Sequence, residues 1–279
     1  MKRRDAMKQL GMGAGVTGIM AMTPTFAAIT AAKSETSFSV NGNFDKNRKI
    51  RIAMVIFPDM TQLDFTGPYE TFIHVPGVEV AVVAETLSPV AADGGLRFLP
   101  SHAFDSFDSA DVLFVPGGPG QSRQMTNPAM LAYLQKIGSK ATYVTSVCTG
   151  SLLLAAAGLL EGYRATSHWL SIDQLALFNG IEIVHERVVI DRNRITGGGI
   201  TAGIDFGLVL AALMRGDNTA MLLELLLEYT PHPPFNTGTP ALAGPALVNQ
   251  AKAVAKTMLE YRLSQSLAAV RNLKEKKMK

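Results

Sequence analysis

Cys148 is the only cysteine in the sequence, and its neighbours are typical of a catalytic nucleophile. It stands in the string SVCTG, between the β-branched stretch 141–147 and an apolar stretch from Ser151 to Leu160. A nucleophile on such a sharp turn from strand to helix is exposed at the edge of a sheet. The amino end of the helix would stabilise the thiolate and lower the pKa of the thiol. On this spacing alone, a buried structural cysteine is the competing interpretation.

Other polar groups follow expected strands and would meet the cysteine at one edge of a sheet. These groups are Asp64, the pair Gly117 and Gly118, and the glycines at 197–199. Ligands of open α/β sheets bind beyond the carboxyl ends of the strands, where these loops lie. Backbone N–H groups at Gly117, Gly118 and Thr149 could stabilise a developing negative charge, and the Thr149 hydroxyl could donate a hydrogen bond.

The elements that must position these groups alternate along the chain. Strands are expected at 51–57, 78–85, 110–118 and 141–147, with a hairpin around Gly94-Gly95 and a strand pair around the turn at 191–193. Helices are expected from Gly67-Pro68 to Val75, and at 128–138, 151–160, 202–214, 219–229 and 244–276. This alternation predicts an α/β domain with a mostly parallel sheet sandwiched by helices.

Several stretches resemble isonitrile hydratases, a family within the PfpI-type superfamily. They are QLDFTGPYE (62–70), FVPGG (114–118), ATYVTSVCTGSLLLAAAGLLEGYRATSHW (141–169), HERVV (185–189), TGGGITAGIDF (196–206) and EYTPHPPFN (228–236). The resemblance covers roughly residues 50–245. It implies the flavodoxin-like fold of class I glutamine amidotransferase domains, with a cysteine nucleophile elbow.

The resemblance also implies a reaction. Cys148 would be the nucleophile, Asp64 would lie beside it and handle protons, and Thr149 would form a hydrogen bond in the site. Asp at the acidic position matches isonitrile hydratases, whereas many superfamily members have Glu. The implied reaction is hydration of a small isonitrile to an N-substituted formamide through a cysteine thioimidate. It needs no metal or organic cofactor, and the resemblance implies a homodimer.

Two other function classes fit parts of the sequence. Similar domains form the sensor halves of AraC-type regulators, but those need a DNA-binding domain, and one helix is expected after Pro240. The other class is an exported superfamily enzyme or chaperone that acts on carbonyl compounds, amides or peptides. Protease-like relatives have His directly after the cysteine, where this sequence has Thr149, so a peptidase is disfavoured.

The histidines and the late glycines favour structural or backbone roles. His168 lies beside the only tryptophan and His185 lies in VHERVV, and we expect both to be structural. The five histidines show no spacing typical of a metal site, so no metal is expected. The stretch 197–202 fits a dinucleotide motif formally but comes too late in the chain, and we expect Gly199 to line the substrate pocket through its backbone.

The amino-terminal segment resembles an export signal. Residues 1–8 are basic and include the pair Arg3-Arg4, whereas residues 9–32 carry no charge and end in small residues. This order is typical of a twin-arginine signal, cut between 27 and 32. Glycines, threonines and a proline make the uncharged stretch a poor membrane-spanning helix, so we expect a periplasmic protein without a stable membrane anchor.

The expected domain organisation is a signal at 1–32, a polar linker at 33–48 and one domain at 49–279. The 279 residues are 47% hydrophobic, which excludes a disordered chain. The net charge of +3 comes from the ends, because residues 1–8 carry +3 and residues 271–279 carry +4. The rest of the chain is acidic, so nucleic acid is not an expected partner.

The last expected helix has an apolar stripe that should pack on something. Its members recur at spacings of three and four residues, and they are Leu247, Ala251, Val254, Met258 and Tyr261. The chain's own core and a second copy of the chain are both open as the packing partner.

Overall fold

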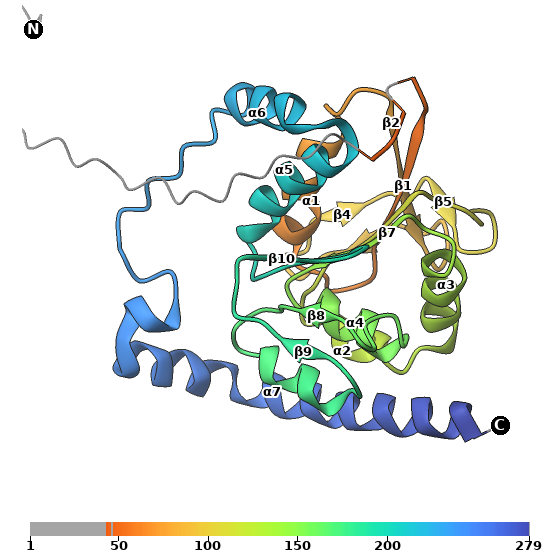
Figure 1. Ribbon diagram of the computed structural model, residues 1–279. Coiled ribbons are helices and arrows are strands. Elements are labelled where there is room, and N and C mark those ends of the chain that lie inside the picture. Colours follow the sequence, from red (N-terminus) through yellow and green to blue (C-terminus); the bar gives the residue numbers. More distant parts are fainter. Residues whose placement is uncertain (1–42, 46, 279) are drawn as a thin grey trace, which may run out of the picture. The chain divides into compact units, whose positions relative to one another are not determined.

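The apolar stretches of the sequence form one seven-stranded sheet in the computed structural model, which describes residues 43–45 and 47–278 (Figure 1). The strands are β1 (Ile50–Val55), β2 (Val78–Ala84), β5 (His102–Ala103), β6 (Val112–Val115), β7 (Tyr143–Val147), β10 (Val188–Asp191) and β11 (Arg194–Gly197). Their order across the sheet is β10-β11-β7-β6-β1-β2-β5. Every neighbouring pair is parallel except β10 and β11, so the expected mostly parallel sheet is confirmed.

Two small sheets accompany the large one. The expected hairpin around Gly94-Gly95 is an antiparallel pair of β3 (Val90–Ala91) and β4 (Arg97–Phe98). A parallel pair of β8 (Arg164–Ala165) and β9 (Glu182–Ile183) was not expected. β8 and β9 have two residues each, and a strand of that length shows no periodic pattern in the sequence.

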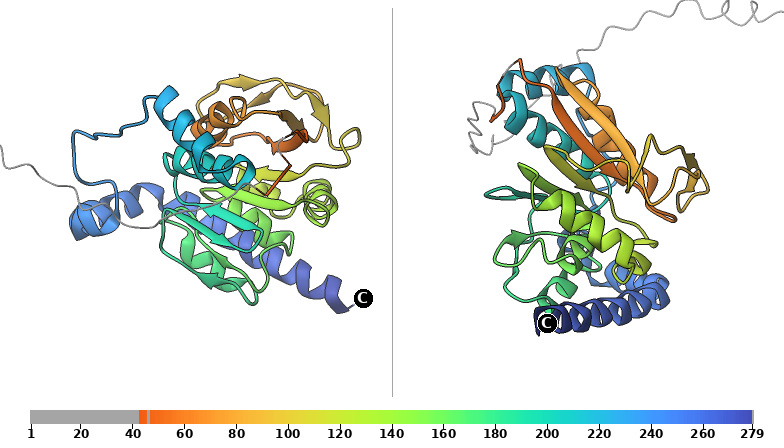
Figure 2. Two further views of the ribbon diagram at one scale, coloured as in Figure 1. Left: turned by 45° about the horizontal axis from the view of Figure 1, so that its top comes forward. Right: turned by 90° about the vertical axis from the view of Figure 1, so that its right-hand side faces the viewer.

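Helices cover both faces of the sheet. They are α1 (Gln62–Phe72), α2 (Gln121–Gln124), α3 (Pro128–Gly138), α4 (Gly150–Ala156), the 3₁₀-helix η1 (Ile172–Leu177), α5 (Ala202–Arg215), α6 (Asp217–Leu226) and α7 (Pro240–Met278). α1 packs on α5 over one face, and α3 and α4 cover the other (Figures 1 and 2). α7 lies outside α4 and also contacts α2 and η1 (Figure 2).

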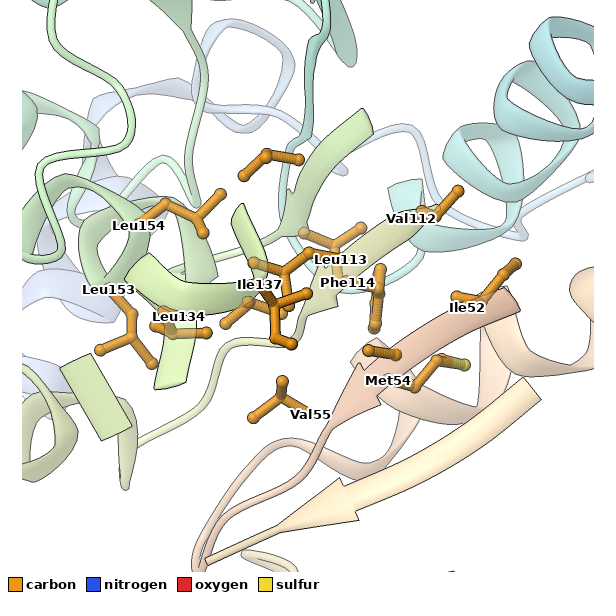
Figure 3. Close-up of a cluster of buried hydrophobic side chains, with 14 of the residues drawn as sticks. Ile52, Met54, Val55, Val112, Leu113, Phe114, Leu134, Ile137, Leu153 and Leu154 are labelled. Carbon is orange, nitrogen blue, oxygen red and sulfur yellow. The ribbon is translucent and has the colours of Figure 1, made fainter. Parts of the chain in front are cut away.

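The core lies on both faces of the central strands, and its part under α3 and α4 illustrates the packing. Figure 3 shows side chains of β1 and β6 beside Leu134 and Ile137 of α3 and Leu153 and Leu154 of α4. All four leucine and isoleucine side chains are fully buried. Such a buried parallel sheet needs apolar residues on both faces, which explains why β1 and β6 are nearly continuous apolar runs.

Helix α1 begins earlier than the sequence predicts. We expected it to open at Gly67-Pro68, but it begins at Gln62 and Pro68 lies inside it. A proline there removes one helical hydrogen bond, the one to the carbonyl of Asp64. The ring packs closely on α5, because a Cβ built at Gly203 would lie 3.2 Å from Pro68 Cδ. Asp64 is therefore in the first turn of a helix and not in a loop.

Helix α7 turns a face other than its apolar stripe towards the protein. Val254 is 86% exposed, and Leu247 and Tyr261 are also exposed. Arg262, which is not a member of the stripe, is 3% exposed, and Ser266 and Ala269 are also buried. Of the stripe, Leu247, Val254 and Tyr261 do not pack on the chain's own core, whereas Ala251 and Met258 are half-buried.

The described residues belong to one compact unit within 38–279. The expected signal at 1–32 lies outside the described residues, as do 33–42 and 46 of the expected linker. The described end of that linker contacts the domain, because Phe44 is buried against Tyr143 and Asn43 N–H donates to the Leu213 carbonyl. Among the described helices, we find none with the length and apolar character that a membrane crossing requires.

Candidate active site

Cys148 lies on a tight elbow between β7 and α4. Its φ is +54°, in the left-handed region that strains a residue with a Cβ. Its N–H is shared between the carbonyls of Gly197 and Gly198, at 3.0 and 2.9 Å. Its carbonyl accepts from the hydroxyls of Ser151 and Ser167, at 3.2 and 3.1 Å. Strained backbone held by this many bonds is characteristic of functional sites.

Glycines allow the loop after β6 to reach this elbow. A Cβ at Gly150 would lie 2.3 Å from the carbonyl oxygen of Val115, and one at Gly117 would lie 2.5 Å from the Thr149 nitrogen and 2.8 Å from Cys148 Cβ. Real Cβ atoms do not approach so closely. The PGG sequence after β6 is therefore what brings backbone N–H groups next to the cysteine.

Asp64 reaches the same place from the first turn of α1. It is fully buried, and its Oδ2 accepts from Gly117 N–H at 3.2 Å. Its Oδ1 has no regular hydrogen bond within the described residues, and the carboxyl interacts with the Cys148 thiol. Burial raises the pKa of Asp64 to about 7, although the thiol and Gly117 N–H both favour the carboxylate. Asp64 can therefore exchange a proton near neutral pH.

The thiol of Cys148 is not acidified, so the expected lowering of its pKa is wrong. Burial raises the pKa of the thiol well above its usual value, and the charge of Asp64 raises it further. The Thr149 N–H and the charge of Arg262 act in the opposite direction. α4 has seven residues, so its dipole is small against the cost of burying a charge. Cys148 rests as a thiol and needs a base.

Two of the three N–H groups expected to stabilise negative charge already have partners. Gly117 N–H donates to Asp64, and Gly118 N–H donates to the Thr149 hydroxyl oxygen at 3.1 Å. Thr149 thus fixes the loop through its side chain, while its backbone N–H faces the Cys148 sulfur. Of the three expected donors, the Thr149 N–H is the one directed at the reacting atom.

Gly199 lies against the imidazole of His168. A Cβ at Gly199 would lie 2.4 Å from His168 Cδ2. Burial lowers the pKa of His168 to about 4, so the ring is neutral, and its Nδ1 accepts from Leu170 N–H at 3.2 Å. His168 therefore packs beside the site as a neutral ring. His185, by contrast, is exposed.

A cavity of about 480 Å³ adjoins the loop that carries His168. Trp169 and Leu170 line it from that loop, and Val248 and Leu259 line it from α7. Charged side chains make up much of the remaining lining, among them Asp173, Lys252, Lys256 and Glu260. The cavity is therefore mixed in character, and neither Cys148 nor Asp64 is among its lining residues.

Sequence reasoning missed Arg262, the buried arginine of α7. Its guanidinium donates to the Ser171 hydroxyl at 2.7 Å, to the Ser122 hydroxyl at 3.3 Å and to the Gly118 carbonyl at 3.3 Å. The available signal was its spacing, because Arg262 follows Met258 by one helical turn and contacts its sulfur at 3.6 Å.

The chemistry of this site is that of a thiol and a carboxyl group. Among the described residues, no group of three or more His, Cys, Asp or Glu side chains is placed to hold a metal ion. A carboxyl group such as Asp64 can accept or return a proton, and a thiol such as Cys148 can supply a nucleophile. The arrangement suits nucleophilic addition to a small electrophile in a buried site.

Comparison of the sequence with known proteins identifies its family. The model of the DJ-1/PfpI family matches residues 50–213. Isonitrile hydratase of Pseudomonas putida is 44% identical over 227 residues, which cover 81% of this chain and 99% of that protein.

A solved structure and a regulator extend the comparison. A THiJ/PfpI family protein from Pseudomonas syringae superposes with a TM-score of 0.75 at 39% identity, covering 86% of this chain and 98% of that one. The HTH-type transcriptional regulator CdhR of Pseudomonas aeruginosa is 37% identical over 48% of this chain, which spans 40% of the regulator.

Proposed function

Because the chain belongs to the DJ-1/PfpI family, we propose that it hydrates isonitriles to N-substituted formamides with Cys148 as nucleophile. The observation that carries the proposal is the buried pairing of Asp64 with Cys148 on the elbow. The near full-length match to an isonitrile hydratase supports the choice of substrate.

In the first step, the Cys148 sulfur attacks the terminal carbon of the isonitrile. The thiol proton passes to the Asp64 carboxylate as the S–C bond forms, and Asp64 then delivers it to that same carbon. The product is a thioimidate, R–N=CH–S–Cys148. Asp64 suits this task because its pKa, about 7, lies near neutrality.

In the second step, water adds to the thioimidate carbon. Ionised Asp64 takes a proton from the water as the C–O bond forms and passes it to the imine nitrogen. The C–S bond of the tetrahedral adduct then breaks and returns the electron pair to sulfur. The hydroxyl proton of the adduct passes through Asp64 to the sulfur as the C=O bond forms, and N-substituted formamide leaves. The sum is one isonitrile plus one water giving one formamide.

The direct test uses the purified enzyme with cyclohexyl isonitrile, following formamide by NMR. Wild type should produce it, whereas Cys148→Ala and Asp64→Asn should lose at least about a hundredfold in rate, as expected when a nucleophile or its proton acceptor is removed. The matched control is Asp59→Asn, because Asp59 precedes α1 on the same segment but is half exposed and pairs with Arg123. Absence of formamide from wild type would reject the proposal.

Other reactions and roles are outcomes of the same experiment. Turnover of methylglyoxal or a peptide in place of the isonitrile would assign the chain to carbonyl or amide chemistry. A sensor role, suggested by the regulator, would give tight isonitrile binding without turnover. We favour an enzyme because the regulator match covers under half of that protein.

We also propose a homodimer formed through exposed apolar side chains. On α6, Leu222, Leu225 and Leu226 are 56%, 76% and 70% exposed, and α7 adds Val254. Apolar surface on this scale favours burial against a second copy. Light scattering should give twice the chain mass, and Leu225→Glu with Leu226→Glu should shift it to one; a wild-type monomer would contradict the dimer.

We further propose export through a twin-arginine signal at 1–32, which places the enzyme in the periplasm. Arg3-Arg4 and the uncharged stretch behind them support this. Replacing both arginines by lysine should retain the full-length chain in the cytoplasm, whereas Lys2→Arg should leave export intact. Equal periplasmic amounts of the two variants would contradict it.

A further inference from the structure

Arg262 is a buried cation whose partners are all neutral. The guanidinium contacts two serine hydroxyls, one backbone carbonyl and the sulfur of Met258. Its side chain is 3% exposed, and within the described residues it forms no ion pair. Burying a charge without a counter-charge costs folding free energy. Such a charge is therefore a candidate for a functional role.

The position of Arg262 links that charge to the elbow. Its Nη2 donates to the carbonyl of Gly118, whose own N–H donates to the Thr149 hydroxyl oxygen. Gly117, the preceding residue, donates to Asp64 and lies against Cys148. The guanidinium therefore contacts the Gly117-Gly118 loop through the Gly118 carbonyl, and the same loop borders Cys148 through Gly117.

Arg262 is the positively charged side chain found to act on Cys148 among the described residues. Asp64 faces the thiol from α1 and opposes its ionisation, and Asp93 adds to the negative charge felt by Asp64. His168 stays neutral near pH 7 because burial lowers its pKa to about 4. Among the described residues, the charge of Arg262 is the one found to favour the thiolate.

We propose that Arg262 is a positioning residue that stabilises the Cys148 thiolate with a fixed charge and holds the Gly117-Gly118 loop against the elbow. This inference rests on the proposed function for its reaction, but the ionisation of the thiol can be measured without an isonitrile. Because two serines and a carbonyl hold the guanidinium on three sides, it does not need to move to act.

The partners of Arg262 come from three parts of the chain, which makes α7 part of the site. Ser122 belongs to α2, Ser171 precedes η1, and Gly118 ends the loop after β6. Neutral hydroxyls satisfy the N–H groups without cancelling the charge, whereas a carboxylate would have cancelled it. With these neutral partners, the positive charge of Arg262 continues to act on Cys148.

The test measures alkylation of Cys148 by iodoacetamide, a neutral reagent, between pH 6 and 10. Arg262→Gln removes the charge but keeps a donor, and Arg262→Lys keeps the charge but loses the planar fork. The Gln variant should show a higher thiol pKa and about tenfold slower alkylation at pH 8, because a thiol pKa higher by about one lowers the thiolate fraction by that factor. The Lys variant should stay near wild type, as should Arg271→Met, an exposed arginine on the same helix.

The outcomes separate charge from structure. A wild-type profile for a folded Arg262→Gln, or equal changes in the Gln and Lys variants, would overturn the proposal. If the Gln variant does not fold, the Lys variant decides: an unchanged profile supports the charge, and a profile displaced by a full pH unit overturns it. Alkylation does not involve an isonitrile, so a wild-type enzyme without hydratase activity would reject the proposed function while leaving this result intact.

Discussion

Asp64 and Cys148 interact directly, and each group shifts the pKa of the other. The charge of Asp64 raises the pKa of the thiol, while the hydrogen bond from the thiol lowers the pKa of the carboxyl, which burial holds at about 7. Near neutral pH the pair can hold a single proton, and that proton is the one the reaction must move twice. The macroscopic pKa values belong to the pair as a unit.

The rate of hydration should rise with pH through about 7. Below that pH, Asp64 is protonated and cannot accept the thiol proton, so kcat/KM should fall by about tenfold per pH unit. Above it, the singly protonated pair persists because the pKa of Cys148 lies well above its usual value. Initial rates between pH 5 and 9 test this, with Asp59→Asn as a control that keeps the same midpoint. A rate that falls from pH 6 to 8 would show that protonated Asp64 is the active form.

Asp64→Asn should make the protein more stable at high pH. The folded form binds the Asp64 proton up to about pH 7, whereas an exposed Asp has an ordinary pKa of 3.8. The stability that this proton contributes is present at low pH and is lost as the pH rises through 7. The advantage of the Asn variant should therefore grow from pH 4 to 8, by at most about 4 kcal/mol.

Urea unfolding at the two pH values measures this difference. Asp191→Asn is the control that should show little change between pH 4 and 8, because Arg192 lowers the pKa of Asp191 below its ordinary 3.8 and its pH-dependent contribution to stability falls below this range. A stability difference between Asp64→Asn and wild type that does not change with pH would mean that Asp64 ionises normally in the folded state.

Cys148→Gly should be inactive but more stable than Cys148→Ala. The φ of +54° costs a residue with a Cβ roughly 1–2 kcal/mol. Glycine relieves this strain but loses roughly 0.5–1 kcal/mol more backbone freedom on folding. Thermal unfolding should favour the Gly variant by about 0.5–1 kcal/mol. At Ala155, inside α4, the same change to Gly should destabilise, by about 1 kcal/mol or more. If Gly also destabilised relative to Ala at position 148, the elbow would be unstrained.

Much of the fold was predictable because its strands are buried on both faces. β1 and β6 are short, nearly continuous apolar runs bounded by loops, which a parallel sheet requires, and β7 is fully buried although it contains Thr145 and Ser146. Cys148 stood out because SVCTG joins such a strand to an apolar helix. The start of α1 was missed because Pro68 suggests a first turn, while its packing on Gly203 allows it inside the helix.

The contribution of α7 could not be read from its own sequence. Hydrophobicity marks a stripe that includes Val254 and not Arg262, but the docked helix exposes Val254 and buries Arg262. The hydroxyls that accept from Arg262 come from α2 and from the residue before η1, far away along the chain. Periodicity finds the face of a helix, but it cannot supply polar partners from other elements.

Gly199 and Gly198 should differ sharply in their tolerance of alanine. A Cβ at Gly199 would lie 2.4 Å from His168 Cδ2, so Gly199→Ala must displace the ring or the loop that supports the N–H of Cys148. A Cβ at Gly198 would meet nothing closer than 3.6 Å.

Gly199→Ala should therefore lower kcat/KM by about tenfold to a hundredfold, since a displacement near 1 Å at a reacting group has that effect. Gly198→Ala should stay within about twofold of wild type, as for a substitution that removes no contact. The His168 imidazole resonances in NMR report the displacement directly and should move in the first variant alone. If both variants kept full activity while the resonances of Gly199→Ala moved, the ring would lie outside the path of the substrate. The loop would then serve Cys148 through its carbonyls alone.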